Sequence, residues 1–541
     1  MHIRTLLFSF LLLHFSYAQQ ITHGPVTGNV TDSSATIYLR TTEPVNIVIY
    51  ALSPDGETIA SDGFTQAARN NSNLFTLKYL KPNTLYQLSF EVSGEPDTMK
   101  GSFTTFPRMG QSGNFTITTG SCQETPNMKV FDRMAELKPR LFIHTGDFTY
   151  PSYQMNDDYP IKYEAVQESY LIRYKEKRNR EMLWHVPMDY IPDDDDGWGA
   201  ARTNGVAAAR YYIDSSARKK KLVNFIRNDT FPDAFRHNCF KGYAEQFPHY
   251  PLPDTSEGLY HKFTFGNCDF FVIDTRATAD NQANQFDYDS AKNKWTFNPK
   301  PNIHIISPKQ MQWLKQQLIS SNADWKFIVS GLPFNQNIKY LIDIGMKMQD
   351  MVVGAAGEKG TGFRLAVSFA TYWAGYPNDS EELLGFIKSS NLQDIIVVSG
   401  DTHHNEIDDG RNAGLPEINA SGLSVTGTHL GHYMDLMSKV VAYPGLKKYA
   451  WNGGGGGLGN KNYKNQFGKI DINGKNFVQL NIVDEDGKTI AGKTIWHSSS
   501  PNFKSFAKQK PYQTRLARMY GKKPSGWMKF LKALAKLKYK P

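Results

Sequence analysis

Cysteine is scarce in this chain of 541 residues, which contains only Cys122, Cys239 and Cys268. The odd count leaves at least one thiol outside any intrachain disulfide. Cys239 and Cys268 could pair, but their separation in the sequence neither requires nor excludes it. Hydrophobic residues make up 40% of the chain and aromatic residues 13%, so it can build large apolar cores. Its length allows several domains, since a single domain commonly has about 100–200 residues.

The apolar run nearest the N-terminus is too short to span a membrane. It covers the 10 residues from Leu6 to Phe15, whereas a membrane span needs roughly 20. Because Arg4 precedes the run and the small residue Ala18 follows it, residues 1–18 are predicted to be a secretory signal peptide. A buried N-terminal helix is the alternative. No cysteine follows the run, which leaves a bacterial lipoprotein anchor without support. We therefore expect a secreted or periplasmic protein.

Acidic residues are missing from the C-terminal segment 501–541, which carries twelve Lys or Arg. The net charge of +9 therefore leaves −3 for the rest of the chain, which is nearly neutral and has no pattern typical of a nucleic-acid-binding face. Within this tail, residues 527–537 place apolar side chains at helical spacing between lysines. The pattern predicts a basic amphipathic helix suited to an anionic membrane surface. A helix that packs on the preceding domain is the alternative.

Three motifs that would indicate other chemistry are incomplete. Residues 422–426 lack the second glycine of a nucleophile elbow, so serine-hydrolase chemistry has little support. The glycine run at 453–457 is not followed by Gly-Lys-Ser/Thr, which excludes a phosphate-cradling P-loop. The run Asp193–Asp196 lacks the Asp/Asn-Gly-Glu spacing of an EF-hand.

Residues 19–108 are predicted to form a small all-β domain. Short runs of alternating apolar residues are separated by turn clusters such as residues 53–56 and 81–83. About seven such strands fit an Ig-like or fibronectin-like sandwich. Residues 107–113 are the expected linker. The clearest strand candidates are 36–40, 46–50, 74–77 and 85–90.

From about residue 115 to 495, predicted strands alternate with predicted helices. This pattern indicates an α/β domain, for which we set the bounds 109–500. Most of its strand candidates end in a polar or turn-forming group, and sites in open α/β sheets collect outside the carboxyl ends of strands. The strand candidates are 115–119, 141–145, 183–188, 269–274, 326–330 and 394–398, and the helix candidates include 128–137, 161–179 and 310–318.

Two of these strands end in Gly-Asp, which is how a buried strand brings a carboxylate to the edge of a sheet. Asp147 follows one strand and Asp401 the other, with His403 two residues beyond Asp401. The pair of motifs predicts a metal centre and favours a hydrolase. Cys122, at the end of another strand, could be a metal ligand or a buried inert thiol. The run Asp193–Asp196 could bind Ca²⁺ or Mg²⁺, or form a solvated loop.

Six landmarks occur in a defined order. They are Gly120-Ser121-Cys122, Gly146-Asp147-Phe148-Thr149-Tyr150, Phe271-Val272-Ile273-Asp274-Thr275-Arg276, Gln310-x-x-Trp313-Leu314, Trp373-Ala374-Gly375-Tyr376-Pro377 and Ser399-Gly400-Asp401-Thr402-His403. Over about residues 22–495 the chain thereby resembles the PhoD-like (alkaline phosphatase D) metallophosphatases, which are related to purple acid phosphatases. The resemblance implies a two-sheet αββα sandwich after the N-terminal β-sandwich.

The resemblance also implies a ligand set. The residues expected to bind Fe³⁺ are Cys122, Asp147, Tyr150 and His403, and those expected to bind Ca²⁺ are Asp147, Asp193, Asp194 and Asp401. Thiolate, phenolate and imidazole suit a trivalent transition metal, and clustered carboxylates suit Ca²⁺. Asp147, His403 and Arg276 are implied as catalytic residues. One departure from the family pattern is Asp195, which stands where the family usually has histidine.

The implied activity is phosphoester hydrolysis by metal-activated hydroxide. An exported phosphomonoesterase of the alkaline phosphatase type is the leading hypothesis. A phosphodiesterase or a phospholipase D-like enzyme on the same fold is the alternative, and the basic tail would favour it by holding the enzyme near lipid. A third hypothesis is a non-catalytic binding protein on a decayed phosphatase scaffold, suggested by the altered region around Asp195.

Overall fold

The computed structural model describes residues 20–125, 128–151, 162–196, 233–292, 294–347, 366–367, 369–424, 451–455 and 464–505. The predicted signal peptide and the predicted amphipathic helix at 527–537 lie outside these residues. Among the described helices, none combines the length and the apolar character needed to cross a membrane.

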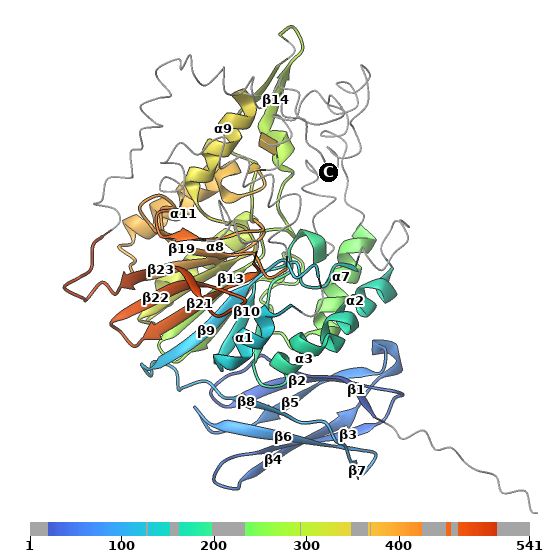
Figure 1. Cartoon of the computed structure of the whole chain (residues 1–541). Coiled ribbons are helices and arrows are strands. Elements are labelled where there is room, and N and C mark those ends of the chain that lie inside the picture. Colours follow the sequence, from blue (N-terminus) through green and yellow to red (C-terminus); the bar gives the residue numbers. More distant parts are fainter. Residues whose placement is uncertain are drawn as a thin grey trace, which may run out of the picture.

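The N-terminal region consists of two antiparallel sheets, stacked at the bottom of Figure 1. Strand side chains alternate between the shared core and the outside: Ile47 and Ile49 are fully buried, whereas Val48 and Tyr50 are half-buried. The strands expected from the sequence here are present. One sheet contains β1 (Ile21–Gly28), β2 (Ser34–Thr41) and β5 (Ser72–Lys78), and the other contains β3 (Asn46–Leu52), β4 (Thr58–Phe64), β6 (Leu85–Val92), β7 (Glu95–Pro96) and β8 (Gly101–Thr104).

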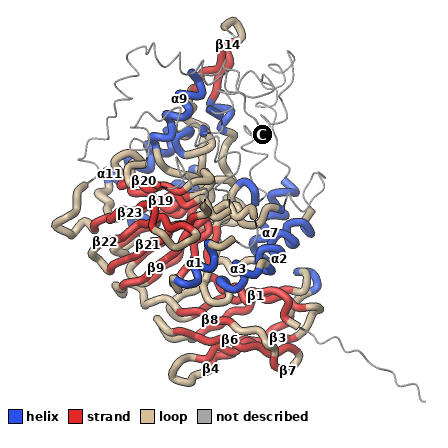
Figure 2. Tube along the Cα trace, viewed as in Figure 1, coloured by secondary structure: helices blue, strands red, loops and turns tan. Residues whose placement is uncertain are grey.

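Two larger sheets form the centre of the region that follows (Figures 1 and 2). The six-stranded sheet has the order β11 (Met188–Tyr190), β10 (Leu141–His144), β9 (Asn114–Gly120), β21 (Gln466–Asn473), β22 (Phe477–Asp484) and β23 (Thr489–Trp496). The seven-stranded sheet has the order β12 (His261–Phe265), β13 (Cys268–Ile273), β16 (Trp325–Ser330), β17 (Ile395–Ser399), β19 (Pro416–Ala420), β18 (Asn405–Asp409) and β20 (Gly454–Gly455).

Strand β17 is buried on both faces, which explains its continuous apolar sequence. Ile396 and Val398 belong to a core shared with the six-stranded sheet. Ile395 and Val397 belong to a second core, which includes side chains of α8 (Pro308–Ser320) and α11 (Pro377–Ser389). The two sheets therefore pack against each other, and these helices cover the outer face of the seven-stranded sheet.

Helices α2 (Tyr163–Lys175), α3 (Lys177–Leu183) and α7 (Asp233–Gln246) lie beside the six-stranded sheet, next to the N-terminal region (Figure 1). Polar contacts join this helical layer to the N-terminal region. The Tyr38 hydroxyl on β2 donates to Gln246 Oε1 over 3.0 Å, and Trp184 Nε1 donates to the Gly24 carbonyl over 2.9 Å. The N-terminal sheets thus support the helices that flank the site described below.

The remaining helices of note are α1 (Val130–Glu136) and α9 (Lys339–Lys347), and β14 (Phe286–Asp289) pairs with β15 (Lys294–Phe297) in a hairpin.

Most predicted strands of the α/β region are present, but the strand predicted at 183–188 is wrong. Leu183 ends α3, and β11 begins only at Met188. Met182 and Leu183 are buried as part of α3, and residues 184–187 form a turn between the helix and β11. The single helix predicted at 161–179 is also wrong, because Glu176 leaves the helical conformation (φ −56°, ψ 119°) and divides it into α2 and α3.

The three cysteines are free and buried, so Cys239 and Cys268 do not pair.

The parallel strands of both sheets end on the same side of the molecule. In the six-stranded sheet β9, β10 and β11 are parallel, and in the seven-stranded sheet β13, β16, β17 and β19 are parallel. Polar residues lie within three positions of the ends of six of these strands, namely Cys122, Asp147, Asp193, Arg276, Asp401 and Ser421. Their convergence defines the candidate site.

Candidate metal centre

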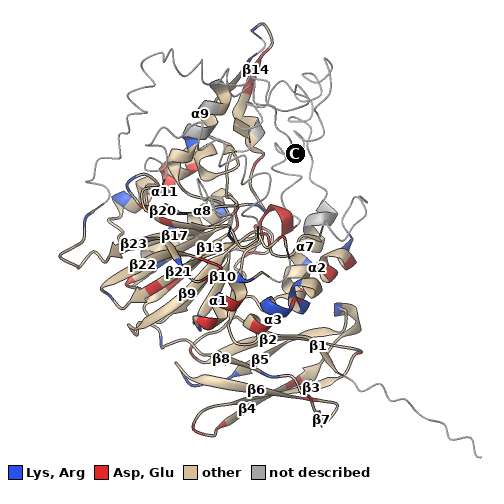
Figure 3. Cartoon of the chain, viewed as in Figure 1, with Lys and Arg blue, Asp and Glu red and all other residues tan. Residues whose placement is uncertain are grey.

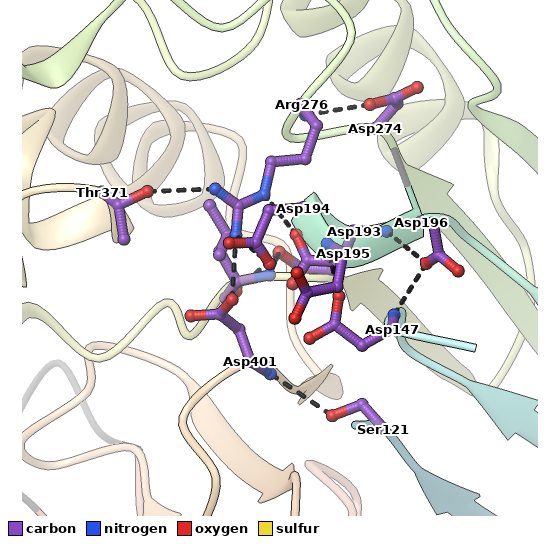
Figure 4. Close-up of polar contacts among 12 residues, drawn as sticks. Ser121, Asp147, Asp193, Asp194, Asp195, Asp196, Asp274, Arg276, Thr371 and Asp401 are labelled. Carbon is purple, nitrogen blue, oxygen red and sulfur yellow. Dashed lines mark hydrogen bonds and ion pairs between the residues drawn. The ribbon is translucent and has the colours of Figure 1, made fainter. Parts of the chain in front are cut away.

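The residues predicted as metal ligands meet in two groups that share one carboxylate. Figure 4 shows the group of aspartates together with Arg276. Potential ligand atoms of Cys122, Asp147 and His403 all lie within 4.8 Å of one another. The same limit holds for the second group, which contains Asp147, Asp193, Asp194 and Asp401. Tyr150 is buried near this junction, close enough for the charges of Asp147 and Cys122 to act on its phenol. Asp147 therefore belongs both to the cysteine–histidine group (Cys122, Asp147 and His403) and to the carboxylate group (Asp147, Asp193, Asp194 and Asp401).

The backbone of this site is unusual. Left-handed conformations, which cost an ordinary residue roughly 1–2 kcal/mol, occur at Cys122 (φ 62°), Asp147 (φ 58°), Tyr150 (φ 53°), Asp401 (φ 66°) and His403 (φ 56°). Such conformations persist where the surroundings fix them, and they concentrate at functional sites. The strained turns direct these side chains toward a common point.

Asp196 fixes the turn that carries Asp147. Its carboxylate is buried and accepts hydrogen bonds of 2.7–2.9 Å from the backbone N–H groups of Asp147, Phe148 and Thr149 and from the Thr149 hydroxyl. It also accepts from the backbone N–H of Asp193 over 2.9 Å. One side chain thereby holds the two loops that supply Asp147 and Asp193.

Two hydroxyls and one amide hold the loop from Asp401 to His403. Ser121 Oγ accepts from the Asp401 N–H over 3.3 Å, and Ser421 Oγ accepts from the His403 N–H over 2.9 Å while lying 3.0 Å from Cys122 Sγ. The amide of Asn419, on β19, donates to the Gly400 carbonyl over 2.7 Å and accepts from the Thr402 hydroxyl over 2.6 Å. Asn419 therefore fixes the residues on both sides of Asp401.

Arg276 places a guanidinium against the carboxylate group. It is 2% exposed, and its Nε pairs with Asp193 Oδ1. Its Nη2 lies 2.9 Å from Asp401 Oδ1 and 3.6 Å from Asp194 Oδ1, and its Nη1 donates to Thr371 Oγ1 over 3.1 Å. The side chain predicted as catalytic is thus at the site and bridges the aspartates.

The aspartates carry more negative charge than Arg276 balances. Burial, together with the neighbouring carboxylates of Asp194 and Asp195, raises the pKa of Asp147 well above its usual range. Burial and the charge of Asp194, opposed by Arg276, raise the pKa of Asp401 to about 6. The Oδ2 atom of Asp193 is buried and accepts no hydrogen bond from the described residues. A bound cation would relieve this repulsion and supply the missing partner, so the residues fit a metal site.

The Asp193–Asp196 run is not a solvated loop. Asp193 and Asp194 belong to the carboxylate group, and Asp196 is the buried acceptor described above. The Asp195 backbone N–H donates to Asp147 Oδ1 over 2.9 Å, a contact that does not depend on its side chain. The sequence prediction missed Asp196, Ser421 and Asn419. The spacing of Ser421 just after a buried strand was the signal available for that residue, whereas nothing in the sequence separates Asp196 from its neighbours.

Comparison with known proteins supports the resemblance seen in the motifs. Residues 212–434 match the family model described as PhoD-like phosphatase. The chain is 27% identical over 348 residues to alkaline phosphatase D of Bacillus subtilis (strain 168), an alignment that covers 60% of this chain. The chain spans about half of that relative, 52% of its length.

Solved structures show the same fold. The structure of PhoD aligns with a TM-score of 0.58 at 17% identity, covering 88% of this chain and 92% of that one. A purple acid phosphatase isolated from yellow lupin (Lupinus luteus) seeds aligns with a TM-score of 0.50 at 10% identity, covering 88% of this chain and 74% of the lupin chain. The resemblance to PhoD-like phosphatases predicted from the sequence is therefore confirmed.

Proposed function

We propose that this protein, which matches the PhoD-like phosphatases over residues 212–434, is an exported metal-dependent phosphoester hydrolase. The observation that carries the proposal is the junction at Asp147. One carboxylate joins a cysteine–histidine group to a group of three further aspartates, all at the carboxyl ends of parallel strands. Two cations bound through a shared carboxylate are a common device for phosphoester hydrolysis.

The types of donor atom suggest which metal each group of side chains would bind. Cys122, Tyr150, His403 and Asp147 would hold Fe³⁺, because thiolate, phenolate and imidazole suit a transition metal. Asp147, Asp193, Asp194 and Asp401 would hold Ca²⁺, which prefers several carboxylate oxygens. When bound, such cations activate water and offset negative charge on phosphoryl oxygens.

The protein side chains would position the ester and balance its charge. Arg276 can offer N–H groups to a phosphoryl oxygen, since its planar guanidinium suits such a group, and Thr371 holds its Nη1 in place. Its pairs with Asp193 and Asp401 link this role to the calcium side. We assign Arg276 to substrate binding, and we assign His403 and Asp147 to the metal-assisted step.

Turnover of model esters tests the proposal. We expect faster hydrolysis of 4-nitrophenyl phosphate than of bis(4-nitrophenyl) phosphate, which would identify a phosphomonoesterase. The reverse order would identify the alternative, a phosphodiesterase or phospholipase D-like enzyme. Asp193→Ala should lose most of the activity, whereas Asp289→Ala, in the β14–β15 hairpin, should keep it. No turnover of either ester by metal-loaded protein would instead favour a binding protein on a decayed scaffold.

The proposed location and partners rest on sequence features that lie mostly outside the described residues. Residues 1–18 support export to the periplasm or medium, and the basic tail 501–541 supports contact with an anionic membrane surface. In the view of Figure 3, basic and acidic residues are interspersed along the described elements, which supports our expectation of no specific nucleic-acid recognition. The two N-terminal sheets support an Ig-like or fibronectin-like sandwich.

A further inference from the structure

Arg173, near the end of α2, connects two of the three loops that carry the proposed iron ligands. Its side chain is buried. Its Nε donates to the Phe148 carbonyl over 2.6 Å, and its Nη2 donates to the Glu124 carbonyl over 3.3 Å. Phe148 lies between Asp147 and Tyr150, and Glu124 lies two residues beyond Cys122. A single guanidinium therefore fixes the spacing between these loops.

Glu176 holds Arg173 in this position. Arg173 Nη1 and Glu176 Oε1 are 2.6 Å apart, and both side chains are 5% exposed. The other carboxylate oxygen of Glu176 accepts from Gln123 Nε2 over 3.2 Å, so the acid also binds the residue next to Cys122. Burying a charged pair costs desolvation energy and does not by itself stabilise a fold. The location of this pair, directly behind the candidate site, suggests a functional reason for it.

The same guanidinium lies against the Tyr150 ring. Its central carbon is 5.4 Å from the ring centroid, within the range of a cation–π interaction. The attraction grows when the ring becomes more electron-rich, as it does when the phenol loses its proton to bind a metal.

We propose that Arg173, held by Glu176, is a positioning residue that fixes the Cys122 and Tyr150 loops and keeps a positive charge over the Tyr150 phenolate. This inference rests on the proposed iron centre. It goes beyond that centre because Arg173 is not itself a proposed ligand, and its contacts lie with the two loops and not with the carboxylate group.

The charge predicts a spectroscopic effect that loop fixation alone would not produce. A cation beside the phenolate lowers the energy of its filled ring orbitals, which raises the energy of charge transfer from phenolate to ferric ion. Removing the charge should move that absorption band to longer wavelength. Loss of the hydrogen bonds should separately weaken metal retention, since residues behind metal ligands commonly contribute about 10–100-fold in metal affinity.

The test compares variants of the full iron-loaded protein by visible absorption and by the rate of metal release to a chelator. Arg173→Met should show the longer-wavelength band and faster release. Arg173→Lys keeps the charge but loses the planar set of donors, so its band should stay close to wild type while release is faster. If Arg173→Met does not fold, Arg173→Gln removes the same charge and can still donate to the Phe148 carbonyl.

Arg180 provides the matched control. It lies on α3, and its guanidinium carbon is 5.1 Å from the Trp184 ring centroid, so it makes the same type of contact away from the site. Arg180→Met should leave both the band and the release rate unchanged.

The outcomes separate this inference from the proposed function. An absorption band that is present in the wild type but does not move in Arg173→Met or Arg173→Gln overturns the inference and leaves the iron centre intact. A wild-type protein that contains iron but lacks the band overturns the assignment of Tyr150 as a ligand and the inference with it. A shift of equal size in Arg180→Met would also contradict the inference.

Discussion

Four consecutive aspartates, Asp193 to Asp196, differ in role because each meets a different environment at the end of β11. Asp196 has the clearest role, since its carboxylate accepts the backbone N–H groups that shape the Asp147 turn. Replacing it by asparagine places an amide NH₂ against these donors. We expect Asp196→Asn to destabilise the protein by about 1–3 kcal/mol, the usual cost of unsatisfied buried groups, and to lose metal and activity.

Asp408 supplies a control for this prediction. Its Oδ1 accepts from the backbone N–H groups of Gly410, Asn412 and Ala413 over 2.8–3.2 Å, away from the metal centre. Asp408→Asn should lower the melting temperature by a similar amount but retain metal content and turnover. Equal losses of activity in the two variants, measured below both melting temperatures, would show that Asp196 acts only through stability.

At the residue scale, the sequence predicted the ligands better than their supports. Asp147, Asp401 and His403 were recognisable because Gly-Asp after a buried strand places a carboxylate at the edge of a sheet, and the structure brings these side chains together in the two groups that share Asp147. Arg173 and Glu176 were not recognisable. Their i, i+3 spacing within the helix predicted at 161–179 is typical of a solvent-exposed ion pair, and only the tertiary fold buries it.

Strands β11 and β12, at the edges of the two large sheets, are joined by a buried ion pair. His261 Nε2 lies 3.1 Å from both carboxylate oxygens of Asp189, and His261 Nδ1 donates to the Leu259 carbonyl over 2.8 Å. Both ring nitrogens face acceptors, so the doubly protonated imidazolium is favoured. Burial opposes this charge, but Asp189 and the hydrogen bonds outweigh it and raise the pKa of His261 above its ordinary value.

This pair predicts a pH dependence of stability. Because the pKa of His261 is higher in the folded state, the stability it contributes is fully present below the unfolded pKa of about 6.5 and is lost as the pH rises through the folded pKa. We expect His261→Gln to cost about 3 kcal/mol at pH 6, as breaking a buried pair commonly does, and less at pH 9. Urea unfolding at the two pH values measures the difference.

The pair between His304 and Asp379 offers a comparison, since the His304 side chain is 27% exposed and lies 2.8 Å, from Nδ1 to Oδ1, from the buried Asp379. His304→Gln should cost less at pH 6, because water screens this pair. A cost for His261→Gln that is the same at pH 6 and pH 9 would show that His261 is neutral in the folded protein.

At the element scale, strands were predictable where apolar residues run without interruption, as in β17. The prediction failed at residues 183–188, where Leu183 ends α3, residues 184–187 form a turn and β11 begins only at Met188. Periodicity cannot separate these cases in so short a run. The break between α2 and α3 also escaped prediction, because Glu176 leaves the helix at a position where its carboxylate binds Arg173 and Gln123.

At the scale of the whole molecule, the tail 501–541 gives the largest imbalance of charge. Its twelve basic residues should bind anionic vesicles, since each Lys or Arg near such a surface contributes roughly 1 kcal/mol. Truncation after Ser500 should abolish vesicle binding and leave hydrolysis of a small soluble ester nearly intact. Added salt should weaken binding by the full chain, because the Debye length is only about 10 Å at 0.1 M.

A charge-only variant distinguishes lipid binding from packing. Lys529, Lys532 and Lys536 can be changed to glutamine together, with the corresponding arginine variant as the control that keeps the charge. Vesicle binding should fall in the first and persist in the second. If truncation instead removes solubility or activity, the tail packs on the enzyme, and the membrane role is wrong.

The central claim is that Asp147 joins an iron site to a calcium site. Elemental analysis of the purified protein, loaded with both metals and freed of excess ions, tests it most directly. The account predicts about one iron and one calcium per chain, with both metals reduced in Asp147→Ala, iron alone reduced in Cys122→Ala, and calcium alone reduced in Asp194→Ala. A wild-type protein that retains neither metal, or an Asp147→Ala variant that retains both, would contradict it.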